Sequence, residues 1–139
     1  MIEVNWIAIV LAALSAMIVG SIWYGPAFGK PWAKLANVKK DPNFTTRKAV
    51  ILYVGAFLSA FATATVLAYA AGYVHDVSSD TYLVDTLFVG VVLSVGLVAS
   101  RLYMQDSFEG RRKKLTALNA SNAFVTYVVM AFIIGLLPV

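Results

Sequence analysis

The side chains that most often carry out catalysis are scarce in this sequence. It contains one histidine, His75, and no cysteine. A hydrolytic triad needs a histidine base beside its nucleophile, and a structural zinc site needs several thiolate or imidazole ligands. The carboxylates around His75 do not have the spacing of a metal site. We therefore predict no catalytic residue, no metal and no cofactor, and the balance favours a protein that is not an enzyme.

Asp85 is the one carboxylate that falls near the end of an apolar stretch. In the first turn of a helix, such a group is stabilised by the helix dipole. The alternative is a cation or proton site that Asp85 forms with Asp76 and Asp80. His75 is expected in a connecting loop, exposed to solvent.

A dense aromatic segment could bind a ligand rather than transform one. Gly25 and Pro26 force the chain to turn there, while the aromatic rings anchor the turn at the membrane surface. The simplest interpretation is a structural anchor, and the alternative is a pocket for a lipid or amphiphile in which Lys30 pairs with an anionic head group. The candidate binding residues of this segment are Trp23, Tyr24, Pro26, Phe28, Lys30 and Trp32.

A second candidate binding set lies near the end of the chain. Asn119, Asn122 and Thr126 stand at positions i, i+3 and i+7, which place them on one side of a helix. Polar groups that face lipid are costly, so this stripe should face protein or water. It either holds helices together by hydrogen bonds, or it lines a pore or ligand site.

The elements that must position these residues are membrane-spanning helices. Sixty per cent of the 139 residues are hydrophobic and only 13% are charged. About 20 apolar residues of helix cross a bilayer, and the chain has four such runs, at about 4–24, 49–74, 83–103 and 115–137. The sequence predicts an all-α fold in which residues 1–139 form a single domain, a bundle of four transmembrane helices.

The positive charges predict an orientation for this bundle. All eleven Lys and Arg residues lie in the first connection or around the third, and short cytoplasmic loops carry such an excess. We expect a multi-pass protein of the cell (inner) membrane, with both termini on the non-cytoplasmic side. Within the third connection, Arg101 is expected to pair with Asp106 or Glu109. The alternative is that it binds lipid phosphate together with the neighbouring basic residues Arg111, Arg112, Lys113 and Lys114, although positive-inside signalling also explains this cluster. Basic residues placed in this way indicate no nucleic-acid partner.

Spacing within the first connection predicts a short amphipathic helix in the membrane interface. Phe28, Trp32 and Leu35 recur at i, i+4 and i+7 with lysines between them. The alternative is a solvated basic loop. Rows of small residues inside the spans predict close helix packing. They comprise Ala8, Ala12, Ala16 and Gly20 in the first span, Gly55, Ser59 and Thr63 in the second, and Gly90 and Ser94 in the third. These rows exceed what one bundle obviously needs, so we expect a homo-oligomer.

The sequence resembles the uncharacterised bacterial membrane protein family known as domain of unknown function 1761. The similar residues are Asn5 and Trp6 where the first helix starts, the aromatic segment from Trp23 to Trp32 where it ends, and a final helix that follows a basic stretch. This resemblance implies the four-helix fold. The family has no established activity, so it implies no catalytic residue.

Three functional hypotheses follow from these observations. The first is a non-enzymatic binding, small-solute transport or channel component lined by Asn119, Asn122 and Thr126. The second is a lipid- or amphiphile-binding or modifying protein that uses the turn from Trp23 to Trp32, with membrane lipids as partners and anionic lipid at the cytoplasmic face. The third is an accessory subunit of a larger membrane complex.

Overall fold

The computed structural model describes residues 2–139, which form helices joined by short loops. In chain order the elements are α1 (Trp6–Ile22), a π-helical turn (Trp23–Ala27), α2 (Gly29–Leu35), α3 (Thr46–His75), α4 (Tyr82–Leu93), a second π-helical turn (Ser94–Ala99), α5 (Ser100–Phe108) and α6 (Lys113–Leu136). The segment expected to hold a short amphipathic helix contains α2. Asp41 makes a turn by accepting a hydrogen bond from the amide of Asn43, and α3 begins after Thr45, whose side chain caps it.

Four helical stretches in residues 2–139 are long and apolar enough to cross a membrane. They are α1 with its π-helical turn, α3, the continuous run from α4 through α5, and α6. The outward faces of these helices carry large exposed apolar side chains, such as Ile51, Phe88 and Phe132. A bilayer covers such faces, whereas water does not. The predicted all-α fold with four spanning-length helices is therefore confirmed.

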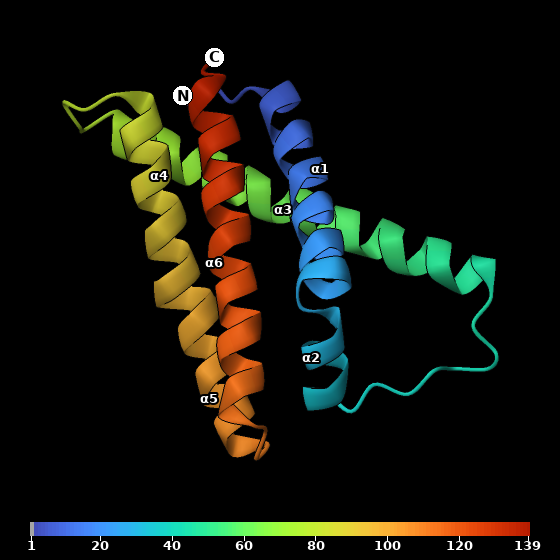
Figure 1. The fold of residues 1–139 in the computed structure, drawn as a ribbon. Helices are drawn as coiled ribbons and strands as arrows, with labels where there is room; N and C mark the ends of the chain where they lie inside the picture. Colours follow the sequence, from blue (N-terminus) through green and yellow to red (C-terminus); the bar gives the residue numbers. More distant parts are fainter. Residues whose placement is uncertain (1) are drawn as a thin grey trace.

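Both termini lie at the same end of the molecule, where α1 begins and α6 finishes (Figure 1). We call this the termini end. The opposite end, which carries α2 and α5, is called the α2 end (Figure 1). Helices α1 and α6, together with the run from α4 to α5, extend between these two ends roughly side by side, so residues from distant parts of the sequence meet at each.

At the termini end, Asn5 connects the start of α1 to the end of α6. Its side-chain oxygen accepts hydrogen bonds from the amides of Ile7 and Ala8, at 3.0 and 3.2 Å, and so caps α1. Its side-chain nitrogen donates to the carbonyl oxygen of Leu137 at 3.2 Å, just beyond α6. One asparagine thus starts the first helix and fastens it to the end of the last.

The buried core lies mainly at the termini end and is built largely from small side chains. Its residues are Ala8, Ile9, Ala12, Ala64, Leu67, Ala68, Ala71, Val89, Met130, Ala131 and Ile134. Helices α4 and α6 approach most closely where glycine replaces a side chain. A Cβ atom added at Gly90 would lie 2.8 Å from Ala131 Cβ, and one at Gly135 would lie 2.9 Å from Leu83 Cα. Small residues therefore allow the backbones to approach, as expected of helices that associate in lipid.

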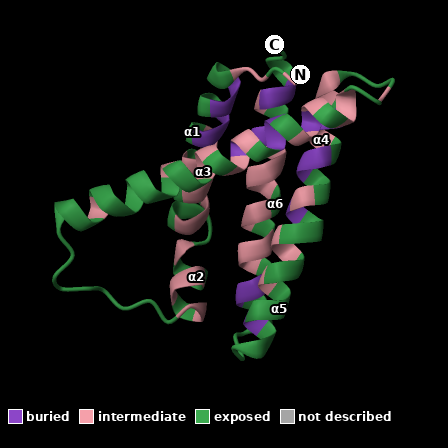
Figure 2. Ribbon diagram, turned by 180° about the vertical axis from the view of Figure 1, so that it is seen from behind, coloured by how far each residue is buried: buried purple, intermediate pink, exposed green. Residues whose placement is uncertain are grey.

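Helix α3 crosses the other helices steeply, and its N-terminal half stands away from them (Figures 1 and 2). The buried residues of α3, within the described chain, lie between Ala64 and Ala71. We call residues 46–60 the α3 arm. Gly55 and Ser59 of the predicted small-residue row are exposed on this arm. These two residues therefore make no close packing within the protomer, in contrast to Ala8 and Ala12 on α1.

Candidate functional site

The two candidate binding sets predicted from the sequence meet at the α2 end. Tyr24, from the π-helical turn after α1, donates its hydroxyl hydrogen to Asn119 Oδ1 on α6 at 2.9 Å. These residues are 95 positions apart in the sequence, and both are partly buried. The structure thus makes one site of the aromatic segment and the polar stripe.

The local conformation of the aromatic segment explains how Tyr24 reaches α6. After α1 the helix widens to a π-helical turn, in which the amide of Phe28 bonds the carbonyl of Trp23 at 2.8 Å. Gly29 then passes so close to the preceding turn that an added Cβ would lie 2.7 Å from the carbonyl oxygen of Tyr24. Glycine at position 29 is therefore required where α2 begins directly after the turn.

Aromatic contacts fix the side chains of this turn in place. The ring centroids of Tyr24 and Trp32 are 5.0 Å apart in an edge-to-face arrangement, and those of Trp23 and Phe28 are 4.6 Å apart. Such pairs contribute about 0.5–1.5 kcal/mol each beyond the area that they bury. Trp32 therefore holds Tyr24 from the side of α2 while Asn119 holds its hydroxyl from the side of α6.

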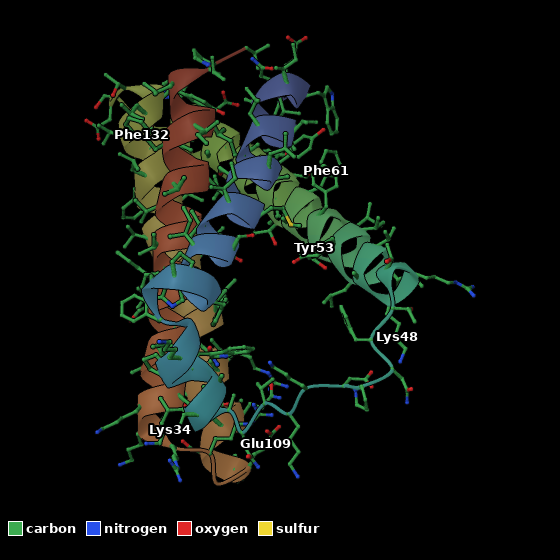
Figure 3. The ribbon with its side chains drawn as sticks, turned by 45° about the vertical axis from the view of Figure 1, so that its right-hand side comes forward. Lys34, Lys48, Tyr53, Phe61, Glu109 and Phe132 are labelled. Carbon is green, nitrogen blue, oxygen red and sulfur yellow. The ribbon has the colours of Figure 1, made fainter. Side chains whose placement is uncertain are left out.

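An apolar groove lies on one side of Tyr24, between α1 and the α3 arm. It has a volume of about 600 Å³. Figure 3 shows Tyr53 on the arm, across the opening from α1. The lining is mostly apolar and consists of Ala16, Met17, Gly20, Ser21, Tyr24, Gly25, Trp32, Leu52, Tyr53, Ala56 and Ala60. The groove exists because α1 presents small residues here while the arm of α3 diverges.

A more polar cleft lies on the other side of Tyr24, between α2, α5 and α6. Its volume is about 410 Å³, and its lining includes Tyr24, Trp32, Asn119 and Arg111. A further hollow of about 290 Å³ adjoins it and is lined by Arg111 and Arg112. Tyr24 and Trp32 line both the groove and the cleft, so these two rings form a wall between the apolar groove and a cleft that also contains Asn119 and Arg111.

The remaining predicted site residues take different positions. Pro26, Phe28 and Lys30 are exposed, and Lys30 does not line the groove or the cleft. Asn122 and Thr126 are half-buried on α6, and neither lines the cleft. The structure therefore gathers Tyr24, Trp32 and Asn119 around one wall and leaves the other members of both sets at its margins.

Arg111, expected only as one member of the basic cluster, makes the ion pairs that were predicted for Arg101. Its Nε donates to Glu109 Oε2 at 2.6 Å and lies 3.8 Å from Asp106 Oδ1. The expected partner of these carboxylates, Arg101, makes neither contact in the described structure. Gly110 explains the difference, because its φ of +68° lets the chain reverse and return Arg111 towards α5. A glycine followed by a basic pair was the available signal.

The carboxylates beside Arg111 are held by several donors. Asp106 is buried and accepts a hydrogen bond from Thr116 Oγ1 at 2.7 Å, which ties α5 to the first turn of α6. The side-chain amide of Gln105 and the guanidinium of Arg111 hold the pKa of Glu109 below its usual range. Glu109 is therefore a stable anion that keeps Arg111 at the rim of the cleft.

A separate polar contact closes the termini end. His75 Nδ1 lies 2.7 Å from Asp85 Oδ2, and the His75 ring meets Tyr82 edge to face. The expectation that His75 lies in a loop was wrong, because α3 continues to this residue and brings it to the first turn of α4. Its side chain is still 42% exposed. Among residues 2–139, no group of three or more His, Cys, Asp or Glu residues could hold a metal ion.

Comparison with known proteins agrees with this architecture. No curated protein and no solved structure matches the chain. The family described as "Protein of unknown function (DUF1761)" matches residues 7–135, which include α1, both sides of the groove and the polar stripe of α6. With nearly its whole length matched, this chain belongs to the DUF1761 family, the family that its aromatic segment and final helix resemble.

Proposed function

We propose that this protein is a membrane-embedded binding protein for an amphiphile, a molecule with an apolar chain and a polar end. One observation carries the proposal: Tyr24 and Trp32 line both an apolar groove and a neighbouring cleft that contains the polar side chains of Asn119 and Arg111. A ligand that passes these two rings meets both environments. The proposed function is binding rather than catalysis.

The groove has the properties expected of a site for an apolar chain. Pockets for small molecules have volumes of about 300–1,000 Å³ and mostly apolar linings with a few polar groups. The groove, at about 600 Å³, lies in this range. It opens sideways between α1 and the α3 arm, so a chain could enter it from the lipid without crossing water.

The cleft supplies the polar part of the same site. Asn119 is held by Tyr24 at 2.9 Å, and Arg111 stands at the rim beside Glu109. A polar group that leaves water for this cleft needs hydrogen-bond partners, because burial without them is costly. The side-chain amide of Asn119, the hydroxyl of Tyr24 and the guanidinium of Arg111 offer such partners in the cleft beside the groove.

The small-solute channel is the weaker proposal for this structure. It requires Asn119, Asn122 and Thr126 to line one water-filled path, but the cleft includes only Asn119 of these three. The bond from Tyr24 uses Asn119 to join helices, a contact that contributes about 0.6 kcal/mol and up to about 1.7. A flux assay in liposomes with all three residues replaced by Ala or Val tests the channel directly.

Orientation, location and assembly belong to the same proposal. The basic residues around α2, α5 and the start of α6 support a cytoplasmic α2 end and non-cytoplasmic termini in the cell membrane. A reporter fused after Val139 should then lie outside the cytoplasm. The exposed α3 arm supports a homo-oligomer, and a mass measurement corrected for detergent that finds only monomer contradicts it.

The decisive experiment fills the groove. Gly20 lines it, and an added Cβ there meets nothing within 4 Å, so Gly20→Leu should fold and place a side chain in the groove. Gly96→Leu is the matched control, since Gly96 is also open but lies on the third span. Native mass spectrometry of protein purified in mild detergent should find a co-purified amphiphile on the wild type and on the Gly96 variant. Its retention by Gly20→Leu, or its absence from all three proteins, contradicts the proposal.

A further inference from the structure

We infer that the polar end of the proposed amphiphile is an anionic oxygen group, a phosphate or a carboxylate. The inference rests on the proposed function and names the chemical class of the ligand for that same site. It begins with hydrogen-bonding groups around the Tyr24–Asn119 bond that have no protein partner.

Two buried side-chain atoms in residues 2–139 have no hydrogen-bond partner, Trp23 Nε1 and Asn122 Nδ2. Trp23 precedes Tyr24 in the chain, and Asn122 lies one helical turn from Asn119, so each is a neighbour of one member of the bonded pair. Both are nitrogen donors, and an indole N–H cannot accept. In a membrane-spanning segment an unpaired polar group is costly. Neither residue lines the groove or the cleft, but each adjoins one that does, so an acceptor that reached past Tyr24 or Asn119 would satisfy it.

One acceptor in this region is already partly used by the protein itself. Asn119 Oδ1, which can accept two hydrogen bonds, receives the hydroxyl hydrogen of Tyr24 at 2.9 Å. A ligand that brought a further donor would find fewer partners than one that brought oxygen acceptors. The hydrogen-bonding pattern thus favours a ligand rich in acceptor oxygens.

Charge at the mouth of the cleft favours the same ligand class. Arg111 and Arg112 line the hollow that adjoins the cleft. Glu109 takes the Nε of Arg111, but a guanidinium carries five N–H donors. Within the described chain, no carboxylate lies within 4 Å of the charged group of Arg112. An anion therefore gains charge-assisted hydrogen bonds at this rim, and a cationic head group would be repelled.

Binding of chemically matched probes to the full-length protein in mild detergent tests the inference. The probes are dodecyl phosphate, dodecanoate, dodecanol and dodecyltrimethylammonium, together with inorganic phosphate as an anion without a chain. We expect dodecyl phosphate or dodecanoate to bind at least about tenfold more tightly than dodecanol, because a hydrogen bond to a charged group contributes on the order of one such factor. The cationic probe should bind more weakly than dodecanol.

Two variants locate the effect. Arg112→Gln should weaken binding of the anionic probes about tenfold and leave dodecanol binding unchanged. Lys114→Gln removes the same charge from a nearby residue that does not line the cleft or its adjoining hollow, so it should change binding by less than about twofold. Equal effects of the two variants would mean that any nearby positive charge favours binding of the anion, and this result would overturn the inference.

A third variant separates a ligand contact from a structural one. Asn122→Leu removes an unpaired donor, so the protein without ligand should become more stable while it binds dodecyl phosphate more weakly. Unchanged phosphate binding in this variant means that buried water satisfies Asn122, and it counts against the inference.

The outcomes also distinguish this inference from the proposed function. If dodecanol binds as tightly as the anionic probes and Gly20→Leu abolishes both, amphiphile binding stands and the anionic head group is wrong. If no dodecyl probe binds, both are wrong. If inorganic phosphate binds as tightly as dodecyl phosphate, the site takes a free anion and the groove has no part in it.

Discussion

The termini end and the α2 end of this molecule differ in how closely their helices pack. At the termini end, α1, α4, α6 and the second half of α3 bury a core of small side chains with glycines at the closest approaches. Towards the α2 end the arm of α3 diverges from the other helices (Figure 2), and the groove and the cleft lie on either side of Tyr24. The termini end has a hollow of its own, of about 380 Å³, beside His75 and Tyr82, but the core beneath it is closely packed and stabilises the fold.

The same helices, α1 and α3 among them, are packed along one part of their length and open along another. Along α1, Ala8 and Ala12 are fully buried, whereas Gly20 on the same helix borders the groove. Along α3, the buried residues begin at Ala64, and the arm that precedes it has none. Small residues thus have two uses in this protein: they allow contact where a partner helix is present and leave space where it is absent.

The largest expected effect comes from glycine substitutions that contrast the two uses. Gly135→Ala would place a Cβ 2.9 Å from the Leu83 backbone, and such overpacking costs about 1–3 kcal/mol. Gly96→Ala meets nothing within 4 Å and should gain up to about 1 kcal/mol from helix propensity. Unfolding in a titration of denaturing detergent measures both changes. Equal effects would show that the termini end is not the tightly packed one.

Removal of His75 tests the polar contact of the termini end. His75→Ala leaves the buried Asp85 carboxylate without the bond at 2.7 Å, and an unsatisfied buried group costs about 1–3 kcal/mol. The double variant His75→Ala with Asp85→Leu should recover part of this loss, because no carboxylate then remains. A loss in the double variant as large as the sum of the single losses contradicts the coupling between the two residues.

Tyr24→Phe sharpens the comparison at the α2 end. The ring and its contact with Trp32 remain, but the bond to Asn119 is lost. Stability should fall by about 0.6 kcal/mol and by no more than about 1.7, as for other hydrogen bonds between membrane helices. Amphiphile binding should fall as well, since Tyr24 forms the wall between groove and cleft. A variant with lower stability and intact binding would restrict Tyr24 to a structural role.

The smallest expected effect is the contribution of Glu109 to stability as pH changes. Its pKa is lowered in the folded protein by Gln105 and Arg111, so its ionised form is favoured by folding. This stabilisation is present above the usual carboxyl pKa of about 4.5 and is lost as pH falls through the lower, folded value. Thermal unfolding of wild type and Glu109→Gln should differ slightly at pH 7 and converge in acid. A difference that persists unchanged in acid contradicts this origin.

The helical fold was accessible from the sequence because lipid imposes a simple rule. A run of about 20 apolar residues without charge can satisfy its backbone only as a helix. The four runs, and the short helix between the first two, follow from that rule and from the spacing of residues such as Phe28 and Trp32. No comparable rule governs the angle at which α3 crosses its neighbours, so the groove beside its arm could not be predicted.

The sequence indicated individual residues of the candidate site but not the contacts between them. Residue type alone marked Tyr24 and Asn119, yet nothing local in the sequence says that residues 95 positions apart meet. The ion pairs of Arg111 were assigned to Arg101 for a related reason: the position of Arg111 depends on the reversal at Gly110, whose positive φ is a property of the folded backbone. His75 was misplaced because its helix extends beyond the last apolar residue.

The fastening made by Asn5 affects how the protein can be assembled. Synthesis proceeds from the N-terminus, so the carbonyl oxygen of Leu137 does not yet exist when α1 enters the membrane. Helix α3 precedes α6 and can already pack against Ala8 and Ile9, but the residues of α6 in the same core are still missing. A nascent chain halted before α6 would therefore leave part of this core open along α1 and α4.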